Sequence, residues 1–124
     1  MPAKKILIAE DEPDTLNILV KKLEHNGYQV MGLSCGRKVP ENSKIYKPDL
    51  IIMDILMGDT DGYSVAEVLR QDKELEDTPI IFMSAQELEY SVIGQRLCEI
   101  GHCEFITKFC SYEDLLMKVR QRIG

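Results

Sequence analysis

The centre of the sequence reads DLIIMDILMGDTDG, from Asp49 to Gly62. It begins with a short run, Leu50 to Met53, that is apolar on both faces, which is typical of a strand buried between two helical layers. The run ends at the charged Asp54, and the glycines and acids that follow indicate a loop. Because open α/β sheets bind ligands at the carboxyl ends of their strands, we interpret Asp54 as the reactive group.

The composition is that of one globular domain, residues 1–124, with 44% hydrophobic and 29% charged residues. Its formal net charge of −6 argues against direct binding to nucleic acid or to an anionic membrane. No apolar stretch reaches the length of a membrane span, and the N-terminus does not resemble a signal peptide. The four cysteines form no CxxC pair, so we expect reduced cysteines, no zinc site and a cytoplasmic location.

Strand patterns and helix patterns alternate along the rest of the chain. The first helix shows the spacing i, i+3, i+4, i+7 of a helix with one buried face, and Asp14 is its expected cap. The expected strands are residues 6–9, 28–33, 50–54, 80–83 and 105–106. The expected helices are one after Asp14, one short helix within 36–47 because Pro40 breaks a longer one, and others at 63–69, 88–100 and after Ser111.

Five strands that alternate with helices predict an α/β fold, in which right-handed crossovers cover both faces of a parallel sheet. The carboxyl ends of parallel strands lie at one edge of the sheet. That edge would bring together Glu10, Asp11, Asp54, Ser84 and Lys108.

This set of side chains is suited to phosphoryl transfer. Three carboxylates in one place repel each other, and a hard cation such as Mg²⁺ removes that repulsion while it keeps waters that a phosphate can displace. Asp54 could then attack a phosphoryl group and form an aspartyl phosphate. Lys108 and the hydroxyl of Ser84 would help to neutralise charge on the transferred oxygens.

Four segments, in this order and at this spacing, resemble successive motifs of the receiver domain of two-component response regulators. They are ILIAEDEP (6–13), the central stretch (49–62), IIFMSA (80–85) and FITK (105–108). The resemblance covers essentially the whole chain. It implies a single flavodoxin-like, doubly wound domain with the strand order 2-1-3-4-5 known for a chemotaxis regulator of this family.

The resemblance also implies roles for the acidic residues. Asp54 matches the phosphoacceptor of the family, and Asp11 matches a ligand of Mg²⁺, for which Mn²⁺ can substitute. Glu10 matches the acidic neighbour of that ligand, and the backbone carbonyl of Leu56 matches a further protein ligand of the metal. The side chains of Leu56 and Gln86 match variable positions that set the lifetime of the phosphorylated state.

Other matched positions lie at the ends of the fourth and fifth expected strands. Ser84 matches the hydroxyl that turns toward the phosphoryl group, and Lys108 matches the lysine that binds it. Phe105 matches an aromatic switch residue. Ala85 matches a small residue that leaves the phosphoryl group accessible.

The function that the resemblance implies is a phosphorylation switch. A histidine kinase or a histidine phosphotransfer protein donates the phosphoryl group to Asp54, and the protein assists this transfer and its reversal without turning over a separate substrate. The new charge changes the surface formed by the fourth helix, fifth strand and fifth helix. That surface regulates a partner or a covalently linked output domain, or joins a second copy in a homodimer.

Two positions near the reactive site depart from the pattern of the family, and the break in the second helix around Pro40 is a third departure, away from that site. Gly58 stands where a proline is usual, and Phe109 follows Lys108 where the family usually has a proline joined through a cis peptide bond. A cis bond before a residue other than proline costs about 2.5–4 kcal/mol, so we predict a trans Lys108–Phe109 bond.

Three alternative functions are compatible with parts of this sequence. A degenerate receiver would bind partners without phosphorylation, and the missing proline after Lys108 is its support. A flavin- or nucleotide-binding protein is disfavoured because acids, rather than glycines and hydrogen-bond donors, occupy residues 10–12. A phosphatase with an aspartate nucleophile is disfavoured because Leu56 stands where such enzymes usually have a second acid.

Overall fold

Strands and helices alternate in the computed structural model, which describes residues 2–85, 90–108 and 110–124. The strands are β1 (Lys5–Ala9), β2 (Gln29–Leu33), β3 (Leu50–Asp54), β4 (Ile80–Ser84) and β5 (Cys103–Thr107). The helices are α1 (Pro13–His25), α2 (Val39–Tyr46), α3 (Gly62–Arg70), α4 (Tyr90–Ile100) and α5 (Tyr112–Ile123).

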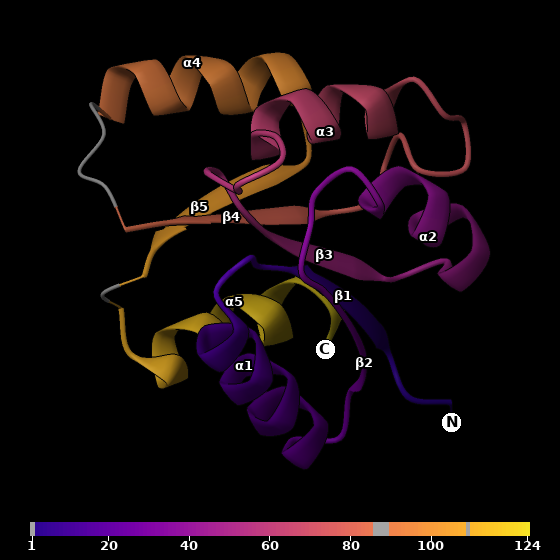
Figure 1. The fold of residues 1–124 in the computed structure, drawn as a ribbon, viewed down its shortest axis with the longest axis vertical. Coiled ribbons are helices and arrows are strands. Elements are labelled where there is room, and N and C mark those ends of the chain that lie inside the picture. The colour runs from indigo at the N-terminus through magenta and orange to yellow at the C-terminus, as the bar shows by residue number, and fades with distance from the viewer. Residues whose placement is uncertain (1, 86–89, 109) are drawn as a thin grey trace.

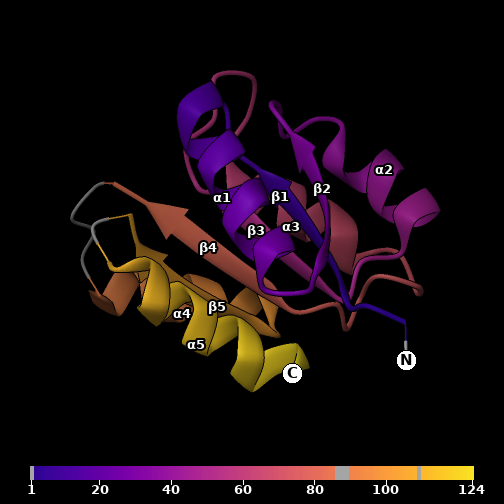
Figure 2. The ribbon, with the colours of Figure 1, turned by 90° about the horizontal axis from the view of Figure 1, so that it is seen from below.

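The five strands form one parallel sheet in the order β2-β1-β3-β4-β5, as the sequence and the resemblance predicted. Helices α1 and α5 cover one face of the sheet, and α2, α3 and α4 cover the other (Figure 1). The view from below shows α1 and α5 in front of the strands (Figure 2). The fold is therefore the doubly wound α/β arrangement that was expected.

The core consists of two apolar layers separated by the sheet. All residues of β3 and β4 are buried, which explains why these strands read as continuous apolar runs. Successive side chains of a strand point to opposite faces. Ile51 and Phe82 accordingly pack with α2, α3 and α4, while Ile52 and Ile81 pack with α1 and α5.

The last helix follows Ser111 as the sequence predicted, whereas the cap of α1 differs from the prediction. Asp61 caps α3 and Ser111 caps α5. The prediction that Asp14 caps α1 was wrong, because the carboxylate of Glu12 accepts the N–H groups of Asp14 and Thr15. Pro at the first helical position moves the cap to the residue before it, which is Glu12.

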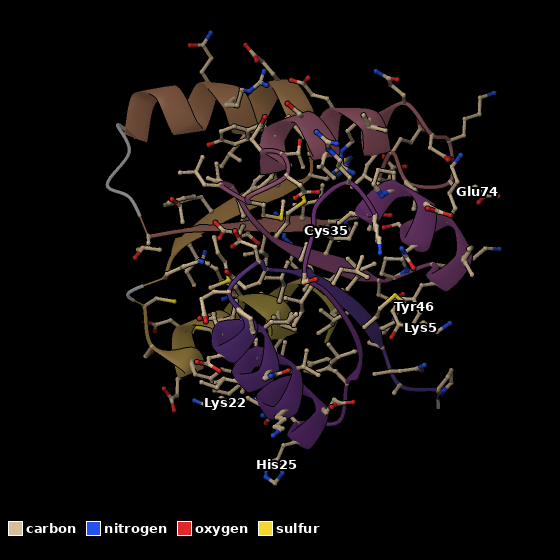
Figure 3. The ribbon with its side chains drawn as sticks, in the orientation of Figure 1. Lys5, Lys22, His25, Cys35, Tyr46 and Glu74 are labelled. Carbon is tan, nitrogen blue, oxygen red and sulfur yellow. The ribbon has the colours of Figure 1, made fainter. Side chains whose placement is uncertain are left out.

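At the amino-terminal edge of the sheet, β1 contacts the end of α2 and the residue before β3. The ammonium group of Lys5 lies 5.4 Å from the centre of the Tyr46 ring (Figure 3). The backbone N–H of Lys5 donates to the Asp49 carboxylate at 2.8 Å. The opposite edge, at the carboxyl ends of the strands, holds the candidate site. No helix in the described part of the chain is both long enough and apolar enough to cross a membrane.

Candidate functional site

One lysine and two carboxylates meet where β1, β3 and β5 end. Nζ of Lys108 lies 2.7 Å from Oδ2 of Asp54 and 2.7 Å from Oε2 of Glu10. The side chains of Glu10 and Asp54 are only 2% and 6% exposed, and that of Lys108 is 21% exposed. Parallel strands explain this meeting, because Asp54 is the last residue of β3, and Glu10 and Lys108 directly follow β1 and β5.

The surroundings of these groups shift two pKa values upward. Burial raises the pKa of Glu10, and the charge of Asp54 adds to this effect although hydrogen bonds from Lys108 and from the N–H of Glu12 oppose it. Burial would lower the pKa of Lys108, but its hydrogen bonds and charge interactions with Asp54 and Glu10 outweigh burial, so that pKa is raised. Lys108 is therefore a charged ammonium group at neutral pH.

Asp11 completes an acidic cluster, which we define as Glu10, Asp11 and Asp54. One carboxylate oxygen from each of these residues lies within 4.8 Å of the others. Asp11 is exposed, so one side of the cluster is open to water. Hard oxygen donors beside open solvent are the ligands that Mg²⁺ prefers, and this donor set fits that metal.

The loop after β3 folds back on the end of that strand. The N–H of Leu56 donates to Oδ1 of Asp54 at 3.2 Å, and Leu56 pairs with Asp61 in a short antiparallel bridge. The two hydrogen bonds around this bridge use the carbonyls of Ile55 and Thr60. The carbonyl of Leu56 is not used by the bridge, which is compatible with its predicted role as a ligand.

A second carboxylate ties this loop to the β2–α2 loop. Oδ1 of Asp59 accepts the N–H of Gly36 at 3.0 Å, and Oδ2 accepts the N–H of Arg37 at 2.9 Å. These hydrogen bonds lower the pKa of Asp59, and the one from Arg37 has the larger effect. A Cβ at residue 36 would lie 2.6 Å from Cε of Met57 and Cγ2 of Thr60, so any larger residue would force these side chains to shift. Sequence reasoning missed this tether, because its partners are more than twenty positions apart and follow no local pattern.

The other predicted site residues lie on β4 and β5. Ser84 is buried at the end of β4, and its backbone carbonyl accepts the N–H of Lys108 at 2.9 Å. Phe105 stands opposite Phe82 in the sheet and packs, partly buried, against the core layer that includes α3 and α4. The structure thus places Ser84 beside the cluster at the next strand end, and Phe105 within the sheet.

The remaining predicted features are Ala85, Gln86 and the peptide bond between Lys108 and Phe109. Ala85, directly after β4, is exposed, and its role in access to the site stays a prediction. Gln86 and Phe109 lie outside the described residues. No cis peptide bond occurs among the described residues, but the Lys108–Phe109 bond is not one of them, so its trans form stays a prediction.

Comparison with known proteins gives a family match and several relatives. Residues 6–120 match the family described as response regulator receiver domain. The alkaline phosphatase synthesis transcriptional regulatory protein PhoP of Bacillus subtilis strain 168 is 33% identical over 118 residues, which cover 94% of this chain and 47% of that protein. The chain therefore spans about half the length of this relative and of others like it.

Solved structures agree with this match. The signal receiver domain of a signal transduction histidine kinase from Syntrophus aciditrophicus superimposes with a TM-score of 0.85 at 34% identity, covering 98% of this chain and 90% of that one. The chemotaxis protein CheY4 of Vibrio cholerae gives a TM-score of 0.90 over 98% of this chain and all of that one, and at 20% identity it shows the fold alone. The chain belongs to the response regulator receiver domain family of two-component signalling.

Proposed function

We propose that this protein is a phosphoacceptor switch in which Asp54 receives a phosphoryl group in a Mg²⁺-dependent reaction. The observation that carries the proposal is the arrangement at the strand ends. The ammonium group of Lys108 lies 2.7 Å from Asp54. Carboxylate oxygens of two further acids, Glu10 and Asp11, lie within 4.8 Å of an oxygen of Asp54, close enough to bind one metal ion together. Mg²⁺, when bound, supplies the positive charge that offsets the repulsion among these acids and the phosphoryl oxygens.

The residues of the chain position the acceptor for an in-line displacement. The N–H of Leu56 and the ammonium of Lys108 each hold one oxygen of Asp54, so the carboxylate has a fixed orientation. A carboxylate oxygen of Asp54 forms the new bond to phosphorus while the bond to the donor breaks, and the electron pair leaves with the donor. In the acyl phosphate that results, the carboxyl group of Asp54 no longer carries its own negative charge, so Lys108 pairs with the phosphoryl oxygens instead.

The proposed phosphoryl donor is a histidine kinase or a histidine phosphotransfer protein. The proposed readout is the surface formed by α4, β5 and α5, which binds a partner, an output domain or a second copy. Phe105 on β5 supports this route, because this strand belongs to that surface and the Phe105 side chain is partly buried against the core layer that includes α4. The proposal includes the cytoplasmic location expected from the sequence, and it treats the protein as a switch rather than as an enzyme with its own substrate.

Intact-protein mass spectrometry tests the proposal. The wild type, incubated with the small donor acetyl phosphate and Mg²⁺, should gain the mass of one phosphoryl group, and EDTA should prevent the gain. Asp54→Asn should gain nothing. Asp14→Asn, which changes an exposed acid in the first turn of α1, should behave as the wild type does. Equal labelling of Asp54→Asn would contradict the acceptor assignment, and no labelling of the folded wild type would favour the phosphorylation-independent module.

A further inference from the structure

The loop after β3 donates one backbone N–H to the acidic cluster. The N–H of Gly58 lies 3.0 Å from Oδ2 of Asp11. We infer that Gly58 is a positioning residue for the metal site, because its N–H holds the Asp11 carboxylate at the cluster. The inference rests on the proposed Mg²⁺ site and names a residue that tunes it.

Asp11 needs such a restraint more than its two neighbours do. Glu10 and Asp54 are buried and share the ammonium group of Lys108. Asp11 is exposed, and within the described residues no ion pair includes it. An exposed carboxylate samples several rotamers, and a cation that binds it must overcome this freedom. A fixed hydrogen-bond donor restricts the rotamers and leaves the remaining lone pairs of the carboxylate for the metal.

The donor is fixed because the loop is anchored on both sides of Gly58. On one side, the N–H of Met57 donates to the carbonyl of Thr60 at 3.1 Å. On the other side, both oxygens of Asp59 are held by the β2–α2 loop. The position of the Gly58 N–H is therefore set by two loops, and a change in either loop reaches Asp11 through this hydrogen bond.

Two substitutions of Gly58 distinguish the effect of its N–H donor from the effect of its backbone flexibility. Proline, the residue expected here from the resemblance, has no N–H and cannot make this bond. A Cβ at residue 58 would lie 3.6 Å from Oδ2 of Asp11, which is an ordinary van der Waals contact. Alanine would thus keep the donor and fit the space, whereas proline would remove the donor.

Isothermal titration with MgCl₂, without any phosphodonor, tests this inference on the wild type, Gly58→Ala and Gly58→Pro. We expect the Mg²⁺ dissociation constants of the wild type and Gly58→Ala to agree within about twofold and that of Gly58→Pro to be about tenfold larger. Restoring the usual residue of the family would then weaken metal binding. Circular dichroism and urea unfolding establish that each variant is folded.

Two results would overturn the inference alone: binding by Gly58→Pro as tight as by the wild type, or equal weakening in Gly58→Ala and Gly58→Pro. Absence of Mg²⁺ binding by the wild type would instead overturn the metal site, and the proposed function with it. A second measurement does not depend on the proline variant. The amide proton of Gly58, followed by NMR in the metal-free protein, should move upfield in Asp11→Ala, and an unchanged resonance would also overturn the inference.

Discussion

The ammonium group of Lys108 contacts two buried carboxylates, those of Glu10 and Asp54. Its positive charge therefore offsets part of the repulsion that a metal ion would otherwise have to offset. The carboxylates of Glu10 and Asp54 also belong to the acidic cluster that would bind Mg²⁺. Lysine and metal therefore compete for these carboxylates, and occupation by one reduces the need for the other. This competition should be measurable as a stability effect that depends on the metal.

Replacement of Lys108 by Met is expected to lower the free energy of unfolding by about 1–3 kcal/mol in EDTA at neutral pH, because buried carboxylates lose their charged partner. Saturating Mg²⁺ should restore most of the loss. Urea unfolding in EDTA and in Mg²⁺ measures both values. The control Lys118→Met removes a partly exposed lysine 3.5 Å from Glu104 and should cost less than about 1 kcal/mol in either condition. A loss in Lys108→Met that Mg²⁺ leaves unchanged would contradict the competition.

Asp59 provides a pH-dependent tether between two loops. Its pKa is lowered by the N–H groups of Arg37 and Gly36, so its ionised form is the one that the fold stabilises. That stabilisation is complete above the ordinary pKa of an aspartate, about 4, and is lost as the pH falls through the lower pKa of the folded state. The wild type should therefore be more stable than Asp59→Ala at pH 7, and this difference should shrink below pH ~4.

Thermal unfolding at pH 7, 5, 4 and 3 measures this difference. Glu76→Ala removes an exposed acid from the loop before β4 and serves as the control, since it should differ little from the wild type at any of these pH values. A stability difference for Asp59→Ala that stays constant from pH 7 to pH 3 would show that the carboxylate charge has no part in the tether.

At the scale of helices and strands, the sequence predicted the elements that are buried on both faces best. The bounds of β3 were predicted in full and those of β4 to one residue, because burial on both faces demands a continuous apolar run. The prediction for β5 covered only residues 105–106 of Cys103–Thr107, since this edge strand is mostly half-buried and includes the charged Glu104. The other edge strand, β2, was predicted to one residue although it is not buried throughout, so the weak prediction is particular to β5.

The candidate site divides in the same way. Glu10, Asp54 and Lys108 could be predicted to meet because a parallel sheet brings its strand ends to one edge. The hydrogen bond from Gly58 to Asp11 and the tether through Asp59 could not be predicted, because they depend on how separate loops settle against each other. The sequence shows only that Gly58 replaces the proline usual in the family, whereas the structure shows that its N–H donates to Asp11.

The side chain of Arg70 joins the end of α3 to the end of α4. Arg70 donates from Nε to the carbonyls of Ile100 and Gly101 at 3.3 and 3.2 Å, and from Nη1 to the carbonyl of Leu75 at 2.9 Å. Carbonyls at the C-terminal end of a helix carry partial negative charge, which favours a cation there. The planar guanidinium group can contact these carbonyls at the same time, whereas an ammonium group cannot match its geometry.

Arg70→Lys is therefore expected to lower the free energy of unfolding by about 1–3 kcal/mol, since partly buried carbonyls lose their donors although the charge is kept. Urea unfolding at neutral pH measures the change. Arg37→Lys is a matched substitution at an exposed arginine and should stay within about 0.5 kcal/mol of the wild type. Equal stability of Arg70→Lys and the wild type would mean that the positive charge alone holds the end of α4.

For the whole molecule, the acidic cluster links metal binding to global unfolding, because its ligands come from the ends of two strands and are brought together only in the folded chain. A ligand that binds only the folded state stabilises it by about 2.7 kcal/mol at a hundred times its dissociation constant. The melting temperature of the wild type should thus rise with MgCl₂, and Asp11→Asn should lose this rise.

The net charge of −6 means that any salt also screens repulsion, so NaCl must hold the ionic strength constant. Glu12→Gln changes the adjacent acid, which caps α1 instead of joining the cluster, and should keep the rise; an equal rise in Asp11→Asn would show that Mg²⁺ stabilises the fold from somewhere other than the acidic cluster.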